Sequence, residues 1–96
     1  MGNIHFAWDA RKARSNTAKH GVSFEEAQTV FLDENARLIE DPDHPNDEER
    51  FLMLGYSFRS RCLVVIHCYG EADSVIRLIS ARRAKAREER VYWSFR

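Results

Sequence analysis

The stretch CLVVIHCY, residues Cys62–Tyr69, is the feature that most constrains how this chain folds. It is a nearly continuous apolar run, and such a run without alternation is typical of a strand that is covered on both faces. A fold that contains it needs a sheet with other elements packed on each side. We therefore predict that Cys62–Tyr69 is a central strand.

A short strand and a helix are predicted at the start of the chain. Ile4–Trp8 alternates weakly between apolar and polar residues, which favours a short first strand. Asp9 is a suitable N-cap for a helix that runs to His20. Gly21 then fits the left-handed position that follows many helix ends.

The remaining elements follow from capping and turn signals. Ser23 and Glu26 have the spacing of a capping box, which predicts a second helix that ends near Leu32. Three more strands and a closing helix are predicted at Ala36–Glu40, Arg50–Ser57, Val75–Ala81 and Ala84–Phe95. Short connections favour antiparallel neighbours. Residues 1–96 are thus predicted to form a single α+β domain, a small antiparallel sheet with two N-terminal helices and one C-terminal helix.

Charge is unevenly distributed along a chain whose formal net charge is zero. Residues 33–49 contain eight acidic residues and one arginine, a net charge of −7, whereas residues 77–96 contain seven basic residues and two glutamates, a net charge of +5. Blocks of this kind indicate local electrostatic sites rather than a generally basic surface.

The two cysteines, Cys62 and Cys68, lie in one predicted strand. Six residues of strand separate their Cα atoms by about 20 Å, whereas a disulfide requires roughly 7 Å or less. They cannot pair with each other, which favours a reducing, cytoplasmic compartment. The chain shows no apolar N-terminal leader and no run long enough to span a membrane.

A basic cluster follows the last predicted strand. Arg82 and Arg83 lie at the end of that strand, and the spacing of Arg83, Arg87 and Arg90 places them on one helix face if the helix starts at Ala84. Guanidinium groups hold phosphate in a bidentate fashion, and a neighbouring aromatic side chain such as Tyr92 can stack on a base. This pattern predicts an RNA phosphate site. A solvated helix with internal salt bridges to Glu88 and Glu89 is the alternative.

The lysines and histidines offer weaker candidates. Lys12 and Lys19 belong to a polar stripe of the first helix, which either extends a nucleic-acid groove or is an ordinary exposed face. Strand alternation places His67 on the same face as Arg61, so we interpret it either as a half-buried general acid or base or as a core histidine. His20 is interpreted as a cation at a helix C-terminus.

A metal site is not predicted. The acidic loop DPDHPNDEE has Asn46 and Leu52 where an EF-hand starting at Asp41 requires glycine and glutamate. The cysteines lack the spacing of a zinc site. We therefore expect no metal and no cofactor.

Four segments of the chain resemble the BrnT toxin family of type II toxin–antitoxin systems. The strings KHGVSFEEA and ISARRAKAREER, the second followed by Tyr92, are the most specific. The segments extend over nearly the whole chain, at Trp8–Phe31, Ile39–Ser57, Arg61–Tyr69 and Ile76–Trp93. The resemblance implies a RelE-like fold and a ribonuclease that inhibits translation. It also implies a BrnA-like antitoxin with a ribbon-helix-helix domain, in a heterotetramer that binds operator DNA only through the antitoxin.

The chemistry of such a ribonuclease is compatible with catalysis without a metal, because the 2′-OH of RNA can attack the adjacent phosphate. Fixed guanidinium groups then stabilise the additional negative charge. We predict phosphate contacts from Arg61, Arg77, Arg82 and Arg83 and proton transfer by His67 or Tyr92. Backbone contacts to RNA are predicted for Lys12, Lys19 and Lys85.

Two other functions are compatible with the same residues. The basic C-terminal surface fits a non-catalytic binding module that receives an acidic partner. A DNA-binding repressor acting alone is less well supported, because direct DNA readers are usually net basic and this chain is neutral.

Overall fold

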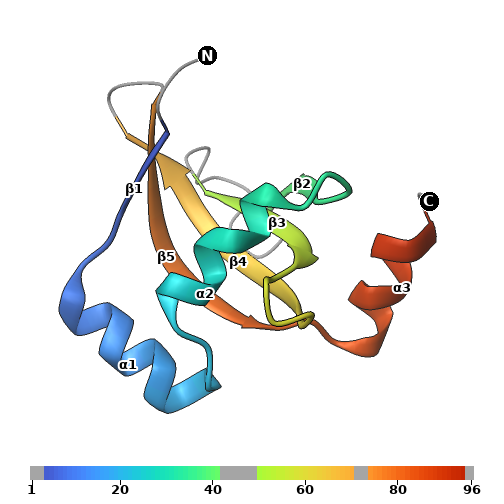
Figure 1. The fold of residues 1–96 in the computed structure, drawn as a ribbon, viewed down its shortest axis with the longest axis horizontal. Coiled ribbons are helices and arrows are strands. Elements are labelled where there is room, and N and C mark those ends of the chain that lie inside the picture. Colours follow the sequence, from blue (N-terminus) through green and yellow to red (C-terminus); the bar gives the residue numbers. More distant parts are fainter. Residues whose placement is uncertain (1–3, 42–49, 71–73, 95–96) are drawn as a thin grey trace.

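Five strands form one sheet in the order β1-β5-β4-β3-β2 (Figure 1). The computed structural model describes residues 4–41, 50–70 and 74–94. The strands are β1 (His5–Ala7), β2 (Arg37–Glu40), β3 (Phe51–Tyr56), β4 (Cys62–Tyr69) and β5 (Val75–Arg83). The predicted central position of Cys62–Tyr69 is confirmed. The acidic loop that was weighed as a metal site lies mostly outside the described residues.

The sheet is mixed rather than purely antiparallel. Neighbours from β2 to β5 are antiparallel, but β1 pairs with the first residues of β5 in parallel. The prediction of an antiparallel sheet is therefore wrong for β1. Almost the whole domain separates β1 from β5 in the sequence, so no short connection fixes their relative direction.

The two N-terminal helices begin where the capping residues predict. In α1 (Ala10–His20), the Asp9 carboxylate accepts hydrogen bonds from the backbone N–H groups of Arg11 and Lys12, and Gly21 follows with φ 70°. In α2 (Phe24–Gln28), Ser23 Oγ accepts from the N–H of Glu26. The chain then continues as a 3-10 helix, η1 (Thr29–Leu32). The prediction that the second helical segment ends near Leu32 is therefore confirmed.

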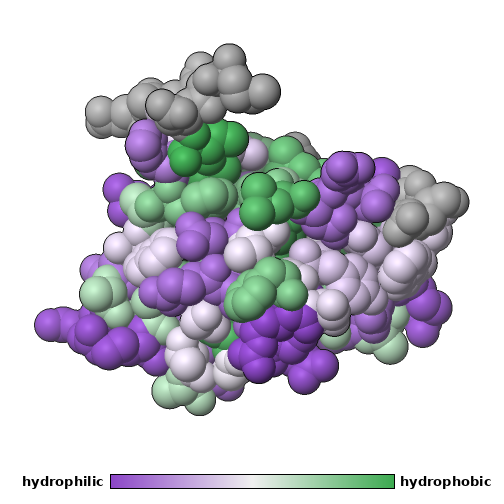
Figure 2. All heavy atoms as spheres, in the orientation of Figure 1, coloured by the Kyte–Doolittle hydropathy of each residue, from purple (hydrophilic) through white to green (hydrophobic). Residues whose placement is uncertain are grey.

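Opposite faces of the sheet carry different helices. Leu63 and Val65 of β4 pack with residues of α2 and η1, whereas the alternating Cys62 and Val64 pack with Tyr92 of α3 (Ala86–Ser94). We call these the helical-layer face and the α3 face. Figure 2 shows the molecule in the orientation of Figure 1, with hydrophilic side chains around small apolar areas. Among the described residues, no helix is long and apolar enough to cross a membrane.

The junction between β5 and α3 differs from the prediction. Strand β5 continues to Arg83 because Arg82 and Arg83 pair with Val64 and Leu63 of β4. The helix starts only at Ala86. Arg83 therefore cannot share a helix face with Arg87 and Arg90, because ladder pairing overrides local helix propensity here.

Candidate functional site

A β-bulge decides which arginines of β5 lie together. Ile66 pairs with Ser80 and His67 with Leu78, so Ile79 is an extra residue in β5. The bulge shifts the alternation of side chains, and Arg77 then lies on the same face as Arg82, the α3 face. Arg83 lies on the other face, together with Arg61 just before β4. The four arginines predicted to contact phosphate are therefore divided between the two faces.

Arg82 is fixed by a carboxylate. Its Nη1 and Nη2 donate to the two carboxylate oxygens of Glu88 at 2.9 and 2.8 Å. The backbone N–H of Lys85 also donates to Glu88, at 2.8 Å. The Arg82 hydrogen bonds lower the pKa of Glu88 to about 2, so the carboxylate is charged at neutral pH. A salt bridge to Glu88 was the predicted alternative to a phosphate site. The salt bridge also orients Arg82 on the α3 face.

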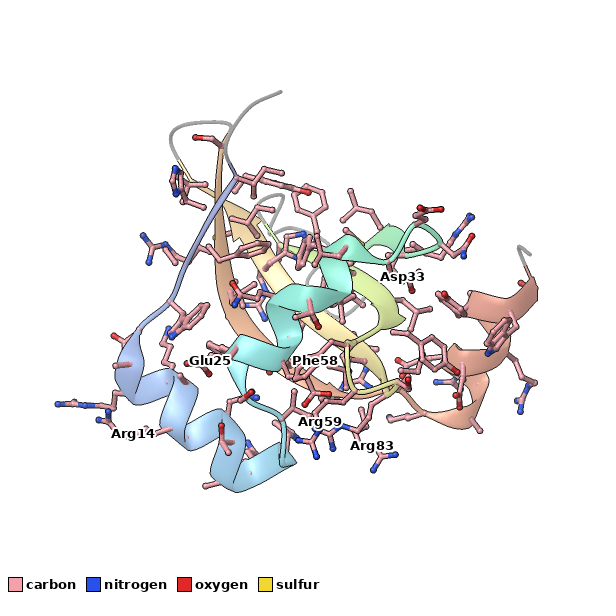
Figure 3. All side chains as sticks on the ribbon, viewed as in Figure 1. Arg14, Glu25, Asp33, Phe58, Arg59 and Arg83 are labelled. Atoms are coloured by element: carbon pink, nitrogen blue, oxygen red, sulfur yellow. The ribbon has the colours of Figure 1, made fainter. Side chains whose placement is uncertain are left out.

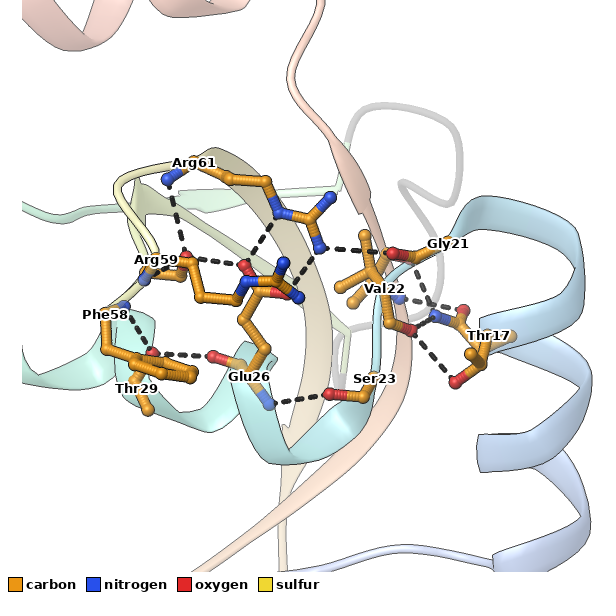
Figure 4. Close-up of polar contacts among 12 residues, drawn as sticks. Thr17, Gly21, Val22, Ser23, Glu26, Thr29, Phe58, Arg59 and Arg61 are labelled. Carbon is orange, nitrogen blue, oxygen red and sulfur yellow. Dashed lines mark hydrogen bonds and ion pairs between the residues drawn. The ribbon is translucent and has the colours of Figure 1, made fainter.

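Arg61 belongs to an internal network (Figure 4). Its Nε donates to buried Glu26 at 2.9 Å, its Nη2 makes a second, shorter contact with the same carboxylate, and Nη2 also donates to the carbonyl of Gly21 at 3.1 Å. Ser57 Oγ donates to Glu26 as well, at 2.6 Å. The Arg61 hydrogen bond holds the pKa of Glu26 below its ordinary value. Arg61 therefore ties α2 to the turn before β4.

His67 is fully buried, at 0% exposure, and not half-buried as expected. Its ring packs between Phe31, Tyr69 and Phe51, with centroid distances of 4.9, 5.4 and 6.2 Å. Nδ1 lies 3.1 Å from the carbonyl oxygen of Val65, and Nε2 has no hydrogen-bond partner among the described residues. Burial lowers the pKa of His67 and keeps the ring neutral. Arg61 lies about 20 Å away along the strand, so the expected His–Arg pair does not form.

Tyr92 fastens α3 to the sheet. It is 3% exposed, and its hydroxyl donates to Asp33 Oδ2 at 2.7 Å. Beside it, the Tyr56 hydroxyl donates to Glu89 at 2.7 Å, which raises the pKa of Tyr56. The expectation was that arginines lower the pKa of Tyr92. Its hydroxyl instead meets a carboxylate.

The two lysines of α1 that were predicted to contact RNA line the same hollow. Lys12, Lys19 and His20 of α1 line a space of about 190 Å³ together with Ser80 of β5. Ser80 lies on the α3 face of β5, between Arg77 and Arg82. The hollow therefore lies where the basic side of α1 meets β5. His20, interpreted from the sequence as a helix-end cation, is a candidate that the sequence analysis missed.

Asn16 holds this arrangement together. Its amide donates to the carbonyls of Val22 and Ala81 at 2.9 and 2.8 Å, and its carbonyl oxygen accepts from the N–H of Ala81 at 3.0 Å. Ser80 Oγ also donates to this oxygen, at 3.3 Å. The side chain pairs with the edge of β5 beyond the residues that β1 covers. It thus fixes α1, and the lysines on it, against the strand.

The other predicted residues are exposed. The side chains of Arg77, Arg83 and Lys85 make no hydrogen bond or ion pair with the residues that the structure describes. Figure 3 shows Arg83 on the same side of the molecule as Arg59. Over residues 4–41, 50–70 and 74–94, no three histidine, cysteine or acidic side chains are grouped as metal ligands. Both cysteines are free thiols, and burial raises the pKa of Cys62 to about 11.

Comparisons with known proteins agree with this fold. The crystal structure of the Brucella abortus ribonuclease toxin BrnT, at 1.1 Å resolution, matches with a TM-score of 0.67 and 21% sequence identity. The match covers 86% of this chain and 99% of that one. At this level of identity it shows a shared fold. A search of curated protein sequences finds no match.

The sequence itself matches one family model, over residues 8–88. That model describes the ribonuclease toxin BrnT of type II toxin–antitoxin systems. The matched region includes α1, α2, the whole sheet from β2 to β5 and the first residues of α3. This chain therefore belongs to the BrnT family of ribonuclease toxins from type II toxin–antitoxin systems.

Proposed function

We propose that this protein is a metal-independent endoribonuclease whose RNA lies along α1 and the α3 face of β5. The observation that carries the proposal is the hollow where Lys12, Lys19 and His20 meet Ser80. On the same face of β5, Arg77 is exposed and Arg82 is paired with Glu88, so Arg77 adds a cationic group and Arg82 can add one where RNA phosphate replaces Glu88. Several cationic groups along one surface suit an RNA backbone, which presents one phosphate after another.

The proposed reaction is attack of the RNA's own 2′-oxygen on the adjacent phosphorus. The bond to the 5′-oxygen of the next nucleotide breaks, which leaves a 2′,3′-cyclic phosphate and a 5′-hydroxyl end. The 2′-OH loses a proton and the leaving 5′-oxygen gains one, and histidine is the side chain most often used for such transfers. His20, at the wall of the hollow, is placed for this role. The ammonium and guanidinium groups stabilise charge on the phosphate.

The residues predicted for the site have different roles in this proposal. Arg77 and Arg82 contact RNA phosphates, with Lys12 and Lys19 beyond them. Arg61, His67 and Tyr92 support the fold through the contacts described above. Arg83 and Lys85 lie at the end of β5, outside the proposed line of contacts.

The proposal includes a protein partner and a compartment. Membership of a type II family supports an antitoxin partner, which we propose carries a ribbon-helix-helix domain and forms a heterotetramer with this toxin. In that complex, operator DNA is bound through the antitoxin. The proposed compartment is the cytoplasm, where a ribonuclease that inhibits translation meets messenger RNA.

Cleavage of a short RNA by the purified protein tests the proposal. We expect cyclic phosphate ends and undiminished cleavage in the presence of a chelator. The double variant Lys12→Gln/Lys19→Gln is expected to lose about 100-fold in rate, on the order of the loss of one well-placed transition-state contact. His20→Gln is expected to lose at least as much.

Arg14→Gln is the matched control, because Arg14 is an exposed cation of α1 that lines a different hollow with Trp8 and Glu25. It should cleave RNA like the wild type. Equal rates for the control and the lysine variant would contradict the proposed surface. A wild-type protein that binds the antitoxin but cleaves no RNA would favour the non-catalytic binding module.

A further inference from the structure

Two large apolar side chains are exposed to solvent and line a hollow that differs from the one in the proposed RNA site. Leu32 of η1 is 81% exposed, and Phe58 in the turn before β4 is 71% exposed. Both line a hollow of about 320 Å³, together with Thr29, Asp33, Tyr56 and Ser57. We call this region the Leu32–Phe58 surface. Exposed large apolar side chains around a concavity are typical of a site for another protein.

The turn that carries Phe58 is rigidly held. The N–H of Phe58 donates to Thr29 Oγ1 at 2.9 Å, and Ser57 Oγ donates to buried Glu26 at 2.6 Å. Backbone hydrogen bonds between Ser57 and Arg61 and between Ser60 and Ser57, both 2.9 Å, close the turn. The backbone of the turn therefore fixes the place of Phe58 on the surface. A surface whose backbone is already ordered loses less conformational entropy on binding than a mobile loop.

Positive charge lies next to this surface. Arg59 follows Phe58 in the turn, Figure 3 shows Arg59 and Arg83 below Phe58 in the view, and Figure 2 shows apolar spheres directly above strongly hydrophilic ones there. Glu26 neutralises Arg61, the third arginine near the turn. Neither Arg59 nor Arg83 forms a hydrogen bond or ion pair through its side chain with the described residues. Asp33 also lines the hollow, so the complementary partner fills the hollow with apolar groups and presents its carboxylates on the side of Phe58 and Arg59.

We propose that the Leu32–Phe58 surface docks an acidic, amphipathic segment of the antitoxin. This inference rests on the proposed toxin–antitoxin function and specifies where the partner binds. A second copy of this chain fits less well, because a symmetric contact through the same surface brings Arg59 and Arg83 of both copies together. RNA fits less well too: Phe58 offers a ring on which a base can stack, but the hollow beside it is lined by Leu32 and by the Asp33 carboxylate, which repels phosphate.

The test measures antitoxin affinity and RNA cleavage on the same set of variants. The probe is the antitoxin encoded in the same operon, titrated into the purified toxin by calorimetry. We expect Phe58→Ala to weaken binding at least tenfold, roughly the effect of losing an interface hot spot. Leu32→Ala is expected to weaken binding less. Arg59→Glu is expected to weaken binding and to reduce the dependence of the affinity on salt, and stopped-flow mixing of the two proteins should show that the loss lies in the association rate.

Two controls match these changes in size and charge. Ile4→Ala removes an exposed apolar side chain beside β1, at the opposite end of the sheet. Arg14→Glu reverses an exposed charge of α1. Both should bind the antitoxin like the wild type. All variants should unfold at the wild-type temperature, because the altered side chains are exposed.

The possible outcomes separate the docking surface from the catalytic function. Unchanged affinity in Phe58→Ala overturns the docking proposal. Loss of RNA cleavage in that variant with unchanged antitoxin affinity assigns the surface to RNA and also overturns it. A wild-type dimer that Phe58→Ala dissociates assigns the surface to a second copy. If the wild type cleaves no RNA but Phe58→Ala still loses the antitoxin, the docking surface stands and the ribonuclease function fails.

Discussion

The two helical parts of this protein are attached to the sheet in different ways. The layer of α1, α2 and η1 buries Phe24, Ala27 and Val30 against β4 and β5, in one continuous apolar cluster. The C-terminal helix α3 has one buried residue, Tyr92. Its other described links to the strands are hydrogen bonds from Tyr56 to Glu89, from Arg82 to Glu88 and from Trp93 to Tyr56, and a ring contact between Trp93 and Tyr56.

The two kinds of attachment therefore make different contributions. Apolar burial stabilises the helical layer, whereas polar contacts mainly fix the orientation of α3. Burial of apolar surface contributes about 25 cal/mol per Å², so the helical layer supplies most of the stabilising free energy. A hydrogen bond contributes only about 1 kcal/mol net, but it requires a defined geometry. We therefore expect the helical layer to unfold with the sheet and α3 to open more readily. The predictions below test this comparison, beginning with the largest effect.

Glu26→Gln removes the charge of the α2 carboxylate that pairs with Arg61 in the turn before β4. The amide keeps the shape of the side chain but leaves the Arg61 guanidinium without its counter-charge. Breaking a buried pair costs about 3 kcal/mol, at the lower end of the usual range because Arg61 is partly exposed. Urea denaturation followed by circular dichroism measures the loss of unfolding free energy.

Glu25→Gln is the control for this variant. Glu25 is the neighbouring residue on α2 and is exposed. Its substitution should change stability by less than about 0.5 kcal/mol, as is usual for surface positions. Similar losses in the two variants would mean that the buried pair adds nothing to the attachment of the helical layer.

The features that hold the helical layer were only partly predictable from the sequence. Asp9, Gly21 and Ser23 act within their own turns, so a few neighbouring residues were sufficient to locate the helix ends. Glu26 has the spacing of a capping-box acid, but its carboxylate binds Arg61, 35 residues further along the chain. Local spacing contains no information about such a distant partner.

The candidate site was predicted less completely, for a similar reason. The stripe of Lys12 and Lys19 is visible from helical periodicity, but the hollow also needs Ser80, which only the tertiary fold brings to α1. Strict alternation along β5 would have placed Arg77 with Arg83. The bulge at Ile79 places it with Arg82 instead. A single extra residue in a strand leaves no clear sequence signal, so the division of the arginines between the two faces was not foreseen.

The pH dependence of stability probes the helical-layer face at His67. Its folded-state pKa is lowered by burial, so below the ordinary histidine pKa of about 6.5 the unfolded chain binds a proton that the folded chain does not. This stabilisation is therefore complete above that pH and is lost as the pH falls. The loss approaches about 1.4 kcal/mol per pH unit. Unfolding titrations between pH 7.5 and 5 measure it.

His67→Phe is the comparison, because it keeps an aromatic ring among Phe31, Phe51 and Tyr69 but removes the titrating group. All other residues are the same in both proteins, so the difference between the two slopes isolates His67. Parallel pH profiles would show that protonation of this imidazole does not oppose folding of the helical layer.

Tyr92→Phe should loosen α3 and leave the helical layer intact. The change removes one hydrogen bond to Asp33, which still accepts from the N–H of Tyr56 at 2.9 Å, so the cost should be about 1 kcal/mol. Hydrogen exchange should accelerate in Ala86–Ser94 and stay unchanged in α1. Tyr69→Phe, on an exposed ring of β4, should alter neither segment. If exchange accelerated equally in α1 and α3, the two attachments would form one cooperative unit, and the polar links of α3 would contribute to the stability of the whole fold.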